Sequence, residues 1–306
     1  MPSRRPLKVG FFFPHGERDM AGATPRWQDI LALAQAAEDA GFDSFWMPDH
    51  LLFRPEGEEA QGLWEVWSLL AAIAASTSRI EIGPFVSCSS FRNPALLAKM
   101  ADTVDEISNG RLILGLGAGW IQAEYDAFGF PFDHRVSRFE EAVQIVHGLL
   151  RQGEIDFTGE YYSARECELR PRGPRPQGPP IMIGTTGQRM LRQTALYADL
   201  WNVFFLWTGN DLARVAALRA EVDAACREVG RDPATLERTA CLLIELPGAT
   251  GTEFPEPPLR GTPEELADTL RAYAAAGISQ VQLRCDPNSM AAIEAFLPVL
   301  EALDAG

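Results

Sequence analysis

Two glycine-rich segments of this chain have the residue types that bind a phosphate group. The first follows an apolar, β-branched run and consists of Gly184, Thr185, Thr186, Gly187 and Gln188. The second follows another apolar run and consists of Gly117, Ala118, Gly119 and Trp120. Where a strand turns through such residues into a helix, free backbone N–H groups and the positive end of the helix dipole point at one spot. Two such segments suggest a phosphorylated cofactor, although each alone could be only a tight turn.

A polar pair, Asp49 and His50, follows a third apolar run at residues 44–48. Because histidine titrates near neutral pH, the pair could hydrogen-bond a cofactor ring or carry a proton. It could equally be a capping aspartate beside a loop histidine. A third alternative is a metal site that joins His15 to His50. The sequence lacks the close-spaced ligand pairs that metals usually need, so we expect no metal.

Other conspicuous side chains have simpler explanations. Cys88 could be a nucleophile, but cysteine is among the most often buried residue types, and no base is evident beside it. Trp64 and Trp67 lie three residues apart in a predicted helix, where packing explains them. Trp120 follows a glycine turn, and there a role in lining a planar cofactor is at least as good an explanation.

The elements that position these residues repeat along the chain, because short apolar runs alternate with longer amphipathic ones. Strands are predicted at residues 8–14, 44–48, 80–87, 112–116, 181–184, 200–205, 238–246 and 280–285. Helices are predicted at residues 24–40, 64–77, 93–107, 135–150, 189–198, 211–229, 264–276 and 289–303. Eight strand–helix units favour an α/β fold of the (β/α)8 barrel type over an open sheet. Chemistry in such a barrel lies at the C-terminal ends of the strands, where the candidates fall.

One segment interrupts the alternation. Residues 153–180 are rich in Pro, Gly and Arg, and residues 155–162 could form a small hairpin. We therefore predict an insertion before the fifth strand. A (β/α)8 barrel reaches this length of 306 residues as one unit, so a single domain is expected over residues 1–306.

The composition restricts the class of partner. A net charge of −15 argues against general binding to nucleic acid or to anionic membranes, which need a basic surface. No apolar run reaches the length of a membrane span, and no cleavable leader is evident at the N-terminus. The five cysteines form no C-x-x-C pair, so neither a disulfide framework nor a zinc site is indicated. A cytoplasmic location is the simplest expectation.

Several stretches, in their order along the chain, resemble the bacterial luciferase-like oxidoreductases, in particular the group that uses the deazaflavin coenzyme F-420. They are residues 40–50, 91–100, 107–112, 115–120 and 198–202. The resemblance implies a (β/α)8 barrel with an insertion, usually a homodimer. It also implies F-420 or, alternatively, FMN lying across the C-terminal mouth of the barrel.

The resemblance further implies roles for individual residues. The cofactor phosphate would rest on backbone groups of the two glycine-rich segments, and Asp49 or His50 would meet the polar edge of the ring. Ser87 and Cys88 would line the ring, and Asn93 is a further candidate contact. A non-prolyl cis peptide bond, frequent in the family, would fall near residues 85–86.

The expected reaction is hydride transfer between F-420 and a small organic substrate, with His50 and Asp49 as the candidate catalytic residues. Sugar-phosphate dehydrogenases of this group carry an acidic residue where this chain has Trp120, so a more apolar substrate is expected. One alternative is an FMN-dependent monooxygenase that uses reduced flavin and O2, supplied by a separate reductase. The remaining alternatives are a non-catalytic flavin-binding barrel and a metal-dependent hydrolase.

Overall fold

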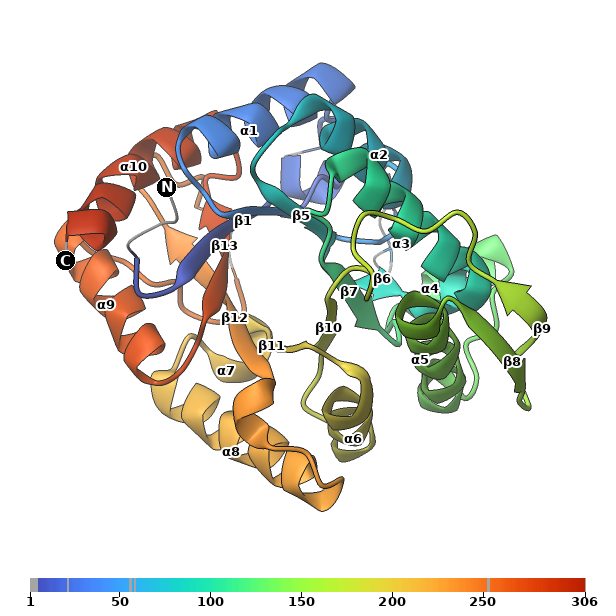
Figure 1. The fold of residues 1–306 in the computed structure, drawn as a ribbon. Helices are drawn as coiled ribbons and strands as arrows, with labels where there is room; N and C mark the ends of the chain where they lie inside the picture. Colours follow the sequence, from blue (N-terminus) through green and yellow to red (C-terminus); the bar gives the residue numbers. More distant parts are fainter. Residues whose placement is uncertain (1–4, 21, 55–56, 58, 252–253, 306) are drawn as a thin grey trace.

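The computed structural model describes residues 5–20, 22–54, 57, 59–251 and 254–305. Within them, parallel strands form a barrel in the order β5-β2-β1-β13-β12-β11-β10-β7-β6 (Figure 1). Their bounds are Lys8–Phe12 (β1), Ser44–Met47 (β2), Glu81–Pro84 (β5), Ser87–Cys88 (β6), Leu114–Gly117 (β7), Ile181–Gly184 (β10), Leu200–Val203 (β11), Glu237–Glu245 (β12) and Gln280–Asp286 (β13). A parallel bridge between Ile82 and Leu112 closes the ring. The predicted barrel is confirmed.

The third barrel strand is split, which the sequence prediction of one strand at 80–87 missed. β5 pairs with β2, and β6 pairs with β7. Between them lies a cis peptide bond at Phe85-Val86, where the family resemblance placed it. A Cβ on Gly115 of β7 would come within 2.2 Å of the Pro84 carbonyl oxygen. Glycine on β7 therefore lets the strand approach the split.

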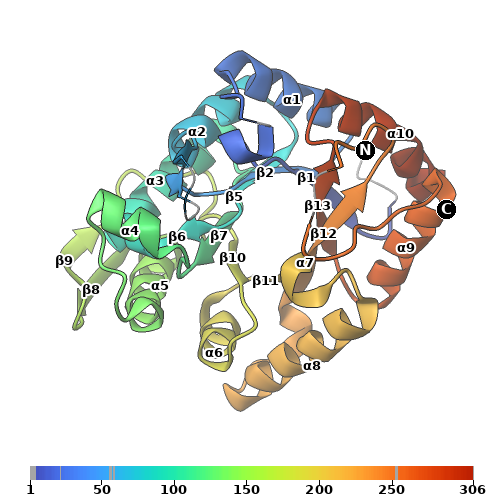
Figure 2. The same cartoon turned by 180° about the vertical axis from the view of Figure 1, so that it is seen from behind.

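Helices cover the outer wall of the barrel, as seen in Figure 1 and, from behind, in Figure 2. Their bounds are Trp27–Asp39 (α1), Val66–Ser76 (α2), Pro94–Ser108 (α3), Gln122–Phe128 (α4), Arg135–Gln152 (α5), Gln188–Tyr197 (α6), Phe205–Thr208 (α7), Leu212–Glu228 (α8), Pro263–Ala275 (α9) and Met290–Ala305 (α10). The capping box of α9, Thr262 with Glu265, confirms the predicted start of that helix. The first helix was predicted too early, because Arg26 and not Thr24 is its N-cap.

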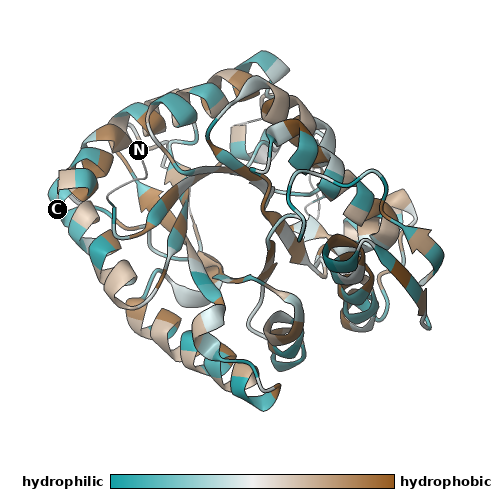
Figure 3. Cartoon of the chain, viewed as in Figure 1, coloured by the Kyte–Doolittle hydropathy of each residue, from teal (hydrophilic) through white to brown (hydrophobic). Residues whose placement is uncertain are grey.

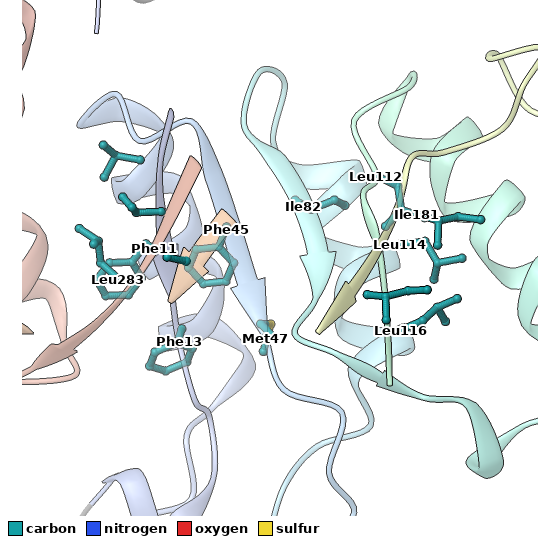
Figure 4. Packing of buried hydrophobic residues seen from close by; sticks show 14 of the residues in the cluster. Phe11, Phe13, Phe45, Met47, Ile82, Leu112, Leu114, Leu116, Ile181 and Leu283 are labelled. Carbon is teal, nitrogen blue, oxygen red and sulfur yellow. The ribbon is translucent and has the colours of Figure 1, made fainter. Parts of the chain in front are cut away.

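The main core lies between the strands and these helices. Strand residues that point outward, such as Phe11, Phe45, Leu114, Ile181 and Leu283, are fully buried there (Figure 4). The helices alternate apolar and polar residues, and Figure 3 shows both kinds on each helix. Burial of this apolar surface is the main force that holds the outer ring to the barrel.

The inside of the barrel is a second, smaller core. It consists of Phe12, Trp46, Phe85, Ile113, Met182, Leu200, Phe205, Cys241 and Leu243. These side chains pack against one another as a buried cluster, in agreement with the packed interior that is typical of (β/α)8 barrels. Any ligand site therefore lies at one end of the barrel.

The predicted insertion is an antiparallel hairpin between α5 and β10. Its strands are β8 (Glu154–Thr158) and β9 (Ser163–Glu168), so the hairpin extends beyond the predicted 155–162. The Glu141 carboxylate of α5 accepts hydrogen bonds from the backbone N–H groups of Glu160, Tyr161 and Tyr162, which fixes the hairpin turn. No helix among the described residues combines the length and apolar character needed to cross a membrane.

The remaining short elements lie mostly in the loops that follow the strands. They are β3 (Leu52–Phe53), β4 (Gln61–Gly62) and three 3-10 helices, η1 (Glu17–Met20), η2 (Ser89–Phe91) and η3 (Pro233–Thr235). β3, β4, η1 and η2 belong to loops at the C-terminal mouth of the barrel, where they surround the candidate residues.

Candidate active site

His50 lies directly after β2, and a buried carboxylate holds its ring. Nδ1 is 2.8 Å from Oε1 of Glu124, a residue in the first turn of α4 that is 1% exposed. The other carboxylate oxygen, Oε2, accepts the Leu51 N–H at 2.6 Å. The His50 side chain keeps 20% exposure. Glu124 thus fixes the ring through Nδ1, and Nε2 is the nitrogen available to a ligand.

Aromatic rings flank His50 at the mouth. Its ring centre lies 4.8 Å from that of Phe53 and 5.9 Å from that of Trp120. Trp120 is 68% exposed, which is unusual for the largest apolar side chain. An exposed tryptophan beside a histidine is a surface suited to a planar ligand.

Asp49 has its carboxylate fully engaged. It accepts hydrogen bonds from Ser87 Oγ at 2.9 Å and from the Cys88 N–H at 3.0 Å. Arg92 Nη1 and Nη2 donate to its two oxygens at 2.6 and 3.1 Å. Arg92 also binds Glu65, the N-cap residue of α2, at 2.6 Å. Asp49 and Ser87 therefore join β2, β6, α2 and the start of α3, and direct contact with a cofactor ring stays a prediction.

Cys88 is an inert thiol in this setting. Burial raises the pKa of Cys88 to about 12, so the nucleophilic thiolate is not formed at neutral pH. Its Sγ lies 3.0 Å from the Tyr125 hydroxyl, which in turn donates to the Ala118 carbonyl at 2.8 Å. Cys88 and Tyr125 together support the glycine-rich turn after β7, residues 117–120.

Gly119 is required by this packing. Its φ of +73° is left-handed, and a Cβ there would lie 2.0 Å from the Tyr125 hydroxyl and 2.6 Å from Cys88 Sγ. Gly119→Ala should therefore lower the free energy of unfolding by about 2–5 kcal/mol, the combined cost of left-handed backbone strain and overpacking. Urea unfolding would measure it.

Gly187→Ala is the matched control for this experiment. A Cβ on Gly187 would meet no atom within 4 Å, and its φ is −79°. The control variant should lose less than about 1 kcal/mol. Equal losses for the two variants would contradict the steric explanation.

The two glycine-rich turns lie side by side. β7 and β10 are neighbours, with Leu116 opposite Ile183, so both turns reach the same part of the mouth. At the turn after β10, Gly187 is the N-cap of α6 and no side chain caps the helix. The Gly187 N–H donates to Thr185 Oγ1 at 3.2 Å, and the next N–H groups begin an uncapped helix. This open N-terminus fits the phosphate of a cofactor.

Two other candidates have structural partners. The side-chain oxygen of Asn93 caps α3 by accepting the N–H groups of Ala95 and Leu96, so its contact with a cofactor stays a prediction. His15 is buried, and its Nε2 donates to the Trp64 carbonyl at 2.8 Å. Burial lowers the pKa of His15 to about 4, so the ring is neutral at pH 7. Among the described residues, no group of three or more His, Cys, Asp or Glu could hold a metal ion.

Phenyl rings form the floor of the mouth. The ring centre of Phe12 lies 4.8 Å from that of Phe85 and 6.5 Å from that of Phe204. Trp207 lies 6.2 Å from Phe204 and is also exposed. An apolar floor of this kind excludes water and favours an apolar substrate.

A cavity of about 360 Å³ lies at the opposite end of the barrel. Its charged lining side chains pair with one another, Lys8 with Glu81 at 2.7 Å and Arg151 with Asp199 at 2.5 Å. This is the N-terminal end of the strands, where such pairs stabilise the barrel rather than act on a ligand. We therefore place the site at the C-terminal mouth.

Sequence reasoning named His50 and both turns as candidates but did not include Glu124 and Arg92, which the structure places beside them. Glu124 belongs to α4, a helix too short to show a periodic pattern. The signal that could have indicated Glu124 is its position four residues after Trp120, in the first turn of a helix that follows a strand end. Arg92 stands beside Asn93 in a stretch that the family resemblance included, but its two carboxylate partners are far away in sequence.

The fold and the mouth define a (β/α)8 barrel with a phosphate-compatible turn and a carboxylate-held histidine. The chain belongs to the luciferase-like monooxygenase family, whose sequence profile matches residues 7–244.

The individual relatives include dehydrogenases or reductases on the one hand and a monooxygenase on the other. The chain is 34% identical over 220 residues to an F-420-dependent hydroxymycolic acid dehydrogenase of Mycobacterium tuberculosis, covering 70% of this chain and 58% of that protein. It is 32% identical over 174 residues to a 5,10-methylenetetrahydromethanopterin reductase of Archaeoglobus fulgidus, covering 57% and 48%. It is 31% identical over 241 residues to the pyrimidine monooxygenase RutA of Enterobacter cloacae, covering 74% and 64%. The alignments thus span about half to two thirds of these relatives.

Solved structures support the fold over its whole length. An F-420-dependent secondary alcohol dehydrogenase superposes with a TM-score of 0.79 at 20% identity, covering 97% of this chain and 99% of that one. The monooxygenase RslO1 of Streptomyces bottropensis gives 0.78 at 19% identity and covers 98% of both chains. At such identity the superpositions establish the fold alone.

Proposed function

We propose that this protein is an F-420-dependent oxidoreductase that transfers a hydride between the coenzyme and a small, largely apolar organic substrate. The observation that carries the proposal is the His50–Glu124 pair, which presents a fixed imidazole nitrogen at the mouth of the barrel. The F-420-dependent dehydrogenase among the relatives supports the choice of coenzyme.

The side chains divide the work as follows. Bound F-420 would supply or accept the hydride at its ring carbon. The turns after β7 and β10 would hold its phosphate through backbone N–H groups. His50 passes a proton between Nε2 and a substrate oxygen, and Glu124 keeps the ring in place through Nδ1. Asp49 is a positioning residue, because it accepts hydrogen bonds from Ser87 and from the Cys88 N–H and so holds β6, the second half of the split third strand.

Water exclusion is the task of the aromatic residues. Phe12, Phe85 and Phe204 provide the floor, and Trp120 lies beside His50 at the rim. A dry site strengthens the charge interactions made during proton transfer. We also propose that the chain works as a homodimer, which a solution mass of twice 33.6 kDa would support.

An FMN-dependent monooxygenase is the second candidate, because the relatives include RutA and the superposed structures include RslO1. That activity would need reduced flavin from a separate reductase. The turn after β10 would hold the phosphate of either cofactor. Selection between F-420 and FMN would therefore depend on contacts with their ring systems.

The proposal is tested by titrating the purified protein with F-420 and, separately, with FMN, and by measuring the change in cofactor fluorescence. We expect F-420 to bind at micromolar or lower concentration and FMN at least about tenfold more weakly, a difference of about 1.4 kcal/mol. Gly187→Asp should weaken F-420 binding, because a carboxylate at the start of α6 competes with the phosphate. Tight binding of FMN alone would turn the assignment to the monooxygenase, and binding of neither would overturn both.

A further inference from the structure

Two hydrogen-bond donors lie on the inner face of β13, on a part of the barrel that the proposed hydride transfer does not use. Gln280, Gln282 and Arg284 alternate along this strand, so their side chains share one face. Gln280 is satisfied, since its Nε2 donates to Ser44 Oγ at 2.7 Å. Gln282 and Arg284 lie nearer the C-terminal mouth and retain N–H groups for which no acceptor occurs among the described residues.

Gln282 carries an orphan donor. The residue is fully buried, and no described atom accepts a hydrogen bond from its Nε2. The orientation of the amide is fixed by its neighbours. Thr239 Oγ1 donates to the Trp201 carbonyl and so accepts from Asn202 Nδ2 at 2.7 Å. Asn202 Nδ2 then also donates to Gln282 Oε1 at 2.8 Å, which leaves Nε2 as the free end.

Arg284 holds the next position toward the mouth. One Nη donates to the Cys285 carbonyl at 2.5 Å, and the other donates to Asp19 Oδ1 at 3.0 Å. The guanidinium carbon lies 5.5 Å from the ring centre of Phe254. Asp19 belongs to η1 and Phe254 to the loop after β12, so Arg284 connects two loops of the mouth. A guanidinium has five N–H groups, and these contacts use two of them.

The surroundings of this pair are apolar. Arg284 stands in register with Phe12 on β1 and with Leu243 on β12. Phe12 in turn contacts Phe85 and Phe204. In the order of the strands around the barrel, β13 is four places from β7, so the donors lie across the mouth from Trp120. A ligand in the mouth would therefore meet donors on one side and aromatic rings on the other.

We propose that Arg284 and Gln282 form the recognition site for a substrate carboxylate, so that the substrate is an apolar, ring-bearing carboxylic acid. A carboxylate has two oxygens, and each can accept from one of these donors. The planar guanidinium is the side chain best suited to such an ion. A ligand with no acceptor would leave Gln282 Nε2 unpaired, which is costly in a buried site. The inference rests on the proposed function, because it assigns a substrate to the same mouth.

The test compares two probes of the same shape by calorimetric titration of the F-420-loaded protein. Naphthalene-2-carboxylate carries the anion, and naphthalene-2-methanol carries a neutral hydroxyl in its place. The wild type should bind the acid at least about tenfold more tightly than the alcohol. Arg284→Met should weaken the acid by about 10–100-fold and leave the alcohol nearly unchanged.

Asp19→Asn gives a result that a purely structural role for Arg284 would not produce. The substitution removes the carboxylate that shares Arg284, so the affinity for the acid should rise severalfold. Arg284→Met alone leaves the Asp19 carboxylate without its partner. The double variant Arg284→Met with Asp19→Asn removes that carboxylate, and it should still bind the acid more weakly than the wild type does. Arg260→Met is the matched control, because Arg260 is exposed and pairs with Glu245 on the same rim. It should change neither affinity.

The proposal is overturned if neither the wild type nor Asp19→Asn prefers the acid. It is also overturned if Arg284→Met weakens both probes alike. A separate F-420 titration keeps the two proposals distinguishable. If the wild type fails to bind F-420, the proposed function is wrong. Preference of that cofactor-free protein for the acid over the alcohol would still support the carboxylate site.

Discussion

Replacing His50 with alanine should lower the turnover of the proposed F-420-dependent reaction by about 10²–10⁴-fold, the usual contribution of a general acid or base. The dissociation constant of F-420 should change by less than about threefold, because in this proposal the phosphate would rest on backbone groups of other loops. The geometry supports this separation. Glu124 binds Nδ1 and thereby reserves Nε2 for the substrate, and the ring is only partly exposed.

Steady-state oxidation of reduced F-420 would measure turnover, and fluorescence titration would measure affinity. The turnover of Glu124→Gln should lie between those of the wild type and His50→Ala, because the amide can still bind Nδ1 but makes a weaker hydrogen bond than the carboxylate. His134→Ala is the control, since His134 is exposed at the N-terminus of α5 and pairs only weakly with Asp133, at 3.9 Å. Unchanged turnover in His50→Ala would reduce His50 to a loop residue, and a parallel fall in affinity would make it a binding residue instead.

The barrel was predictable because its signals are local. Each strand is a largely apolar run of a few residues, and each helix has apolar residues three or four positions apart. Both patterns involve residues that are close together in the sequence. The turn after β10 was predictable for the same reason, since Gly184 to Gln188 are consecutive. The split third strand was missed although residues 80–87 contain a signal for it. Gly83 and Pro84 interrupt the apolar residues, and such a pair is typical of a break in a strand. The family resemblance indicated the position of the cis peptide bond near Phe85-Val86.

The partners in the site were not predictable, because they are far apart in sequence. His50 and Glu124 are 74 residues apart, and Arg92 is 43 residues from Asp49. The pairing of carboxylates with cations depends on how the loops fold over the strand ends. The periodic patterns of the sequence give no information about that folding. The helix-capping role of Asn93, whose oxygen accepts from the Ala95 N–H, is by contrast a local contact, and its contact with a cofactor stays a prediction.

Arg92 is the other residue whose replacement should have a large effect. Its guanidinium joins Asp49, whose side chain is completely buried, to Glu65 at the start of α2. Burial by itself would lower the pKa of Arg92, but Asp49 and Glu65 outweigh it and raise the pKa, so the side chain remains charged. The ion pair connects the loop that carries His50 to the split third strand.

Arg92→Met should lower the free energy of unfolding by about 3–5 kcal/mol, because it leaves the Asp49 carboxylate buried without a counter-ion. Urea unfolding would measure the loss. Arg79→Met is the matched control, since Arg79 is exposed and its contact with Asp39 is 3.8 Å long, and it should change stability by less than about 1 kcal/mol. Adding Asp49→Asn to Arg92→Met should recover part of the loss, because it removes the unpaired charge. If the double variant is no more stable than Arg92→Met, the loss comes from packing of the arginine stem and not from the charge of Asp49.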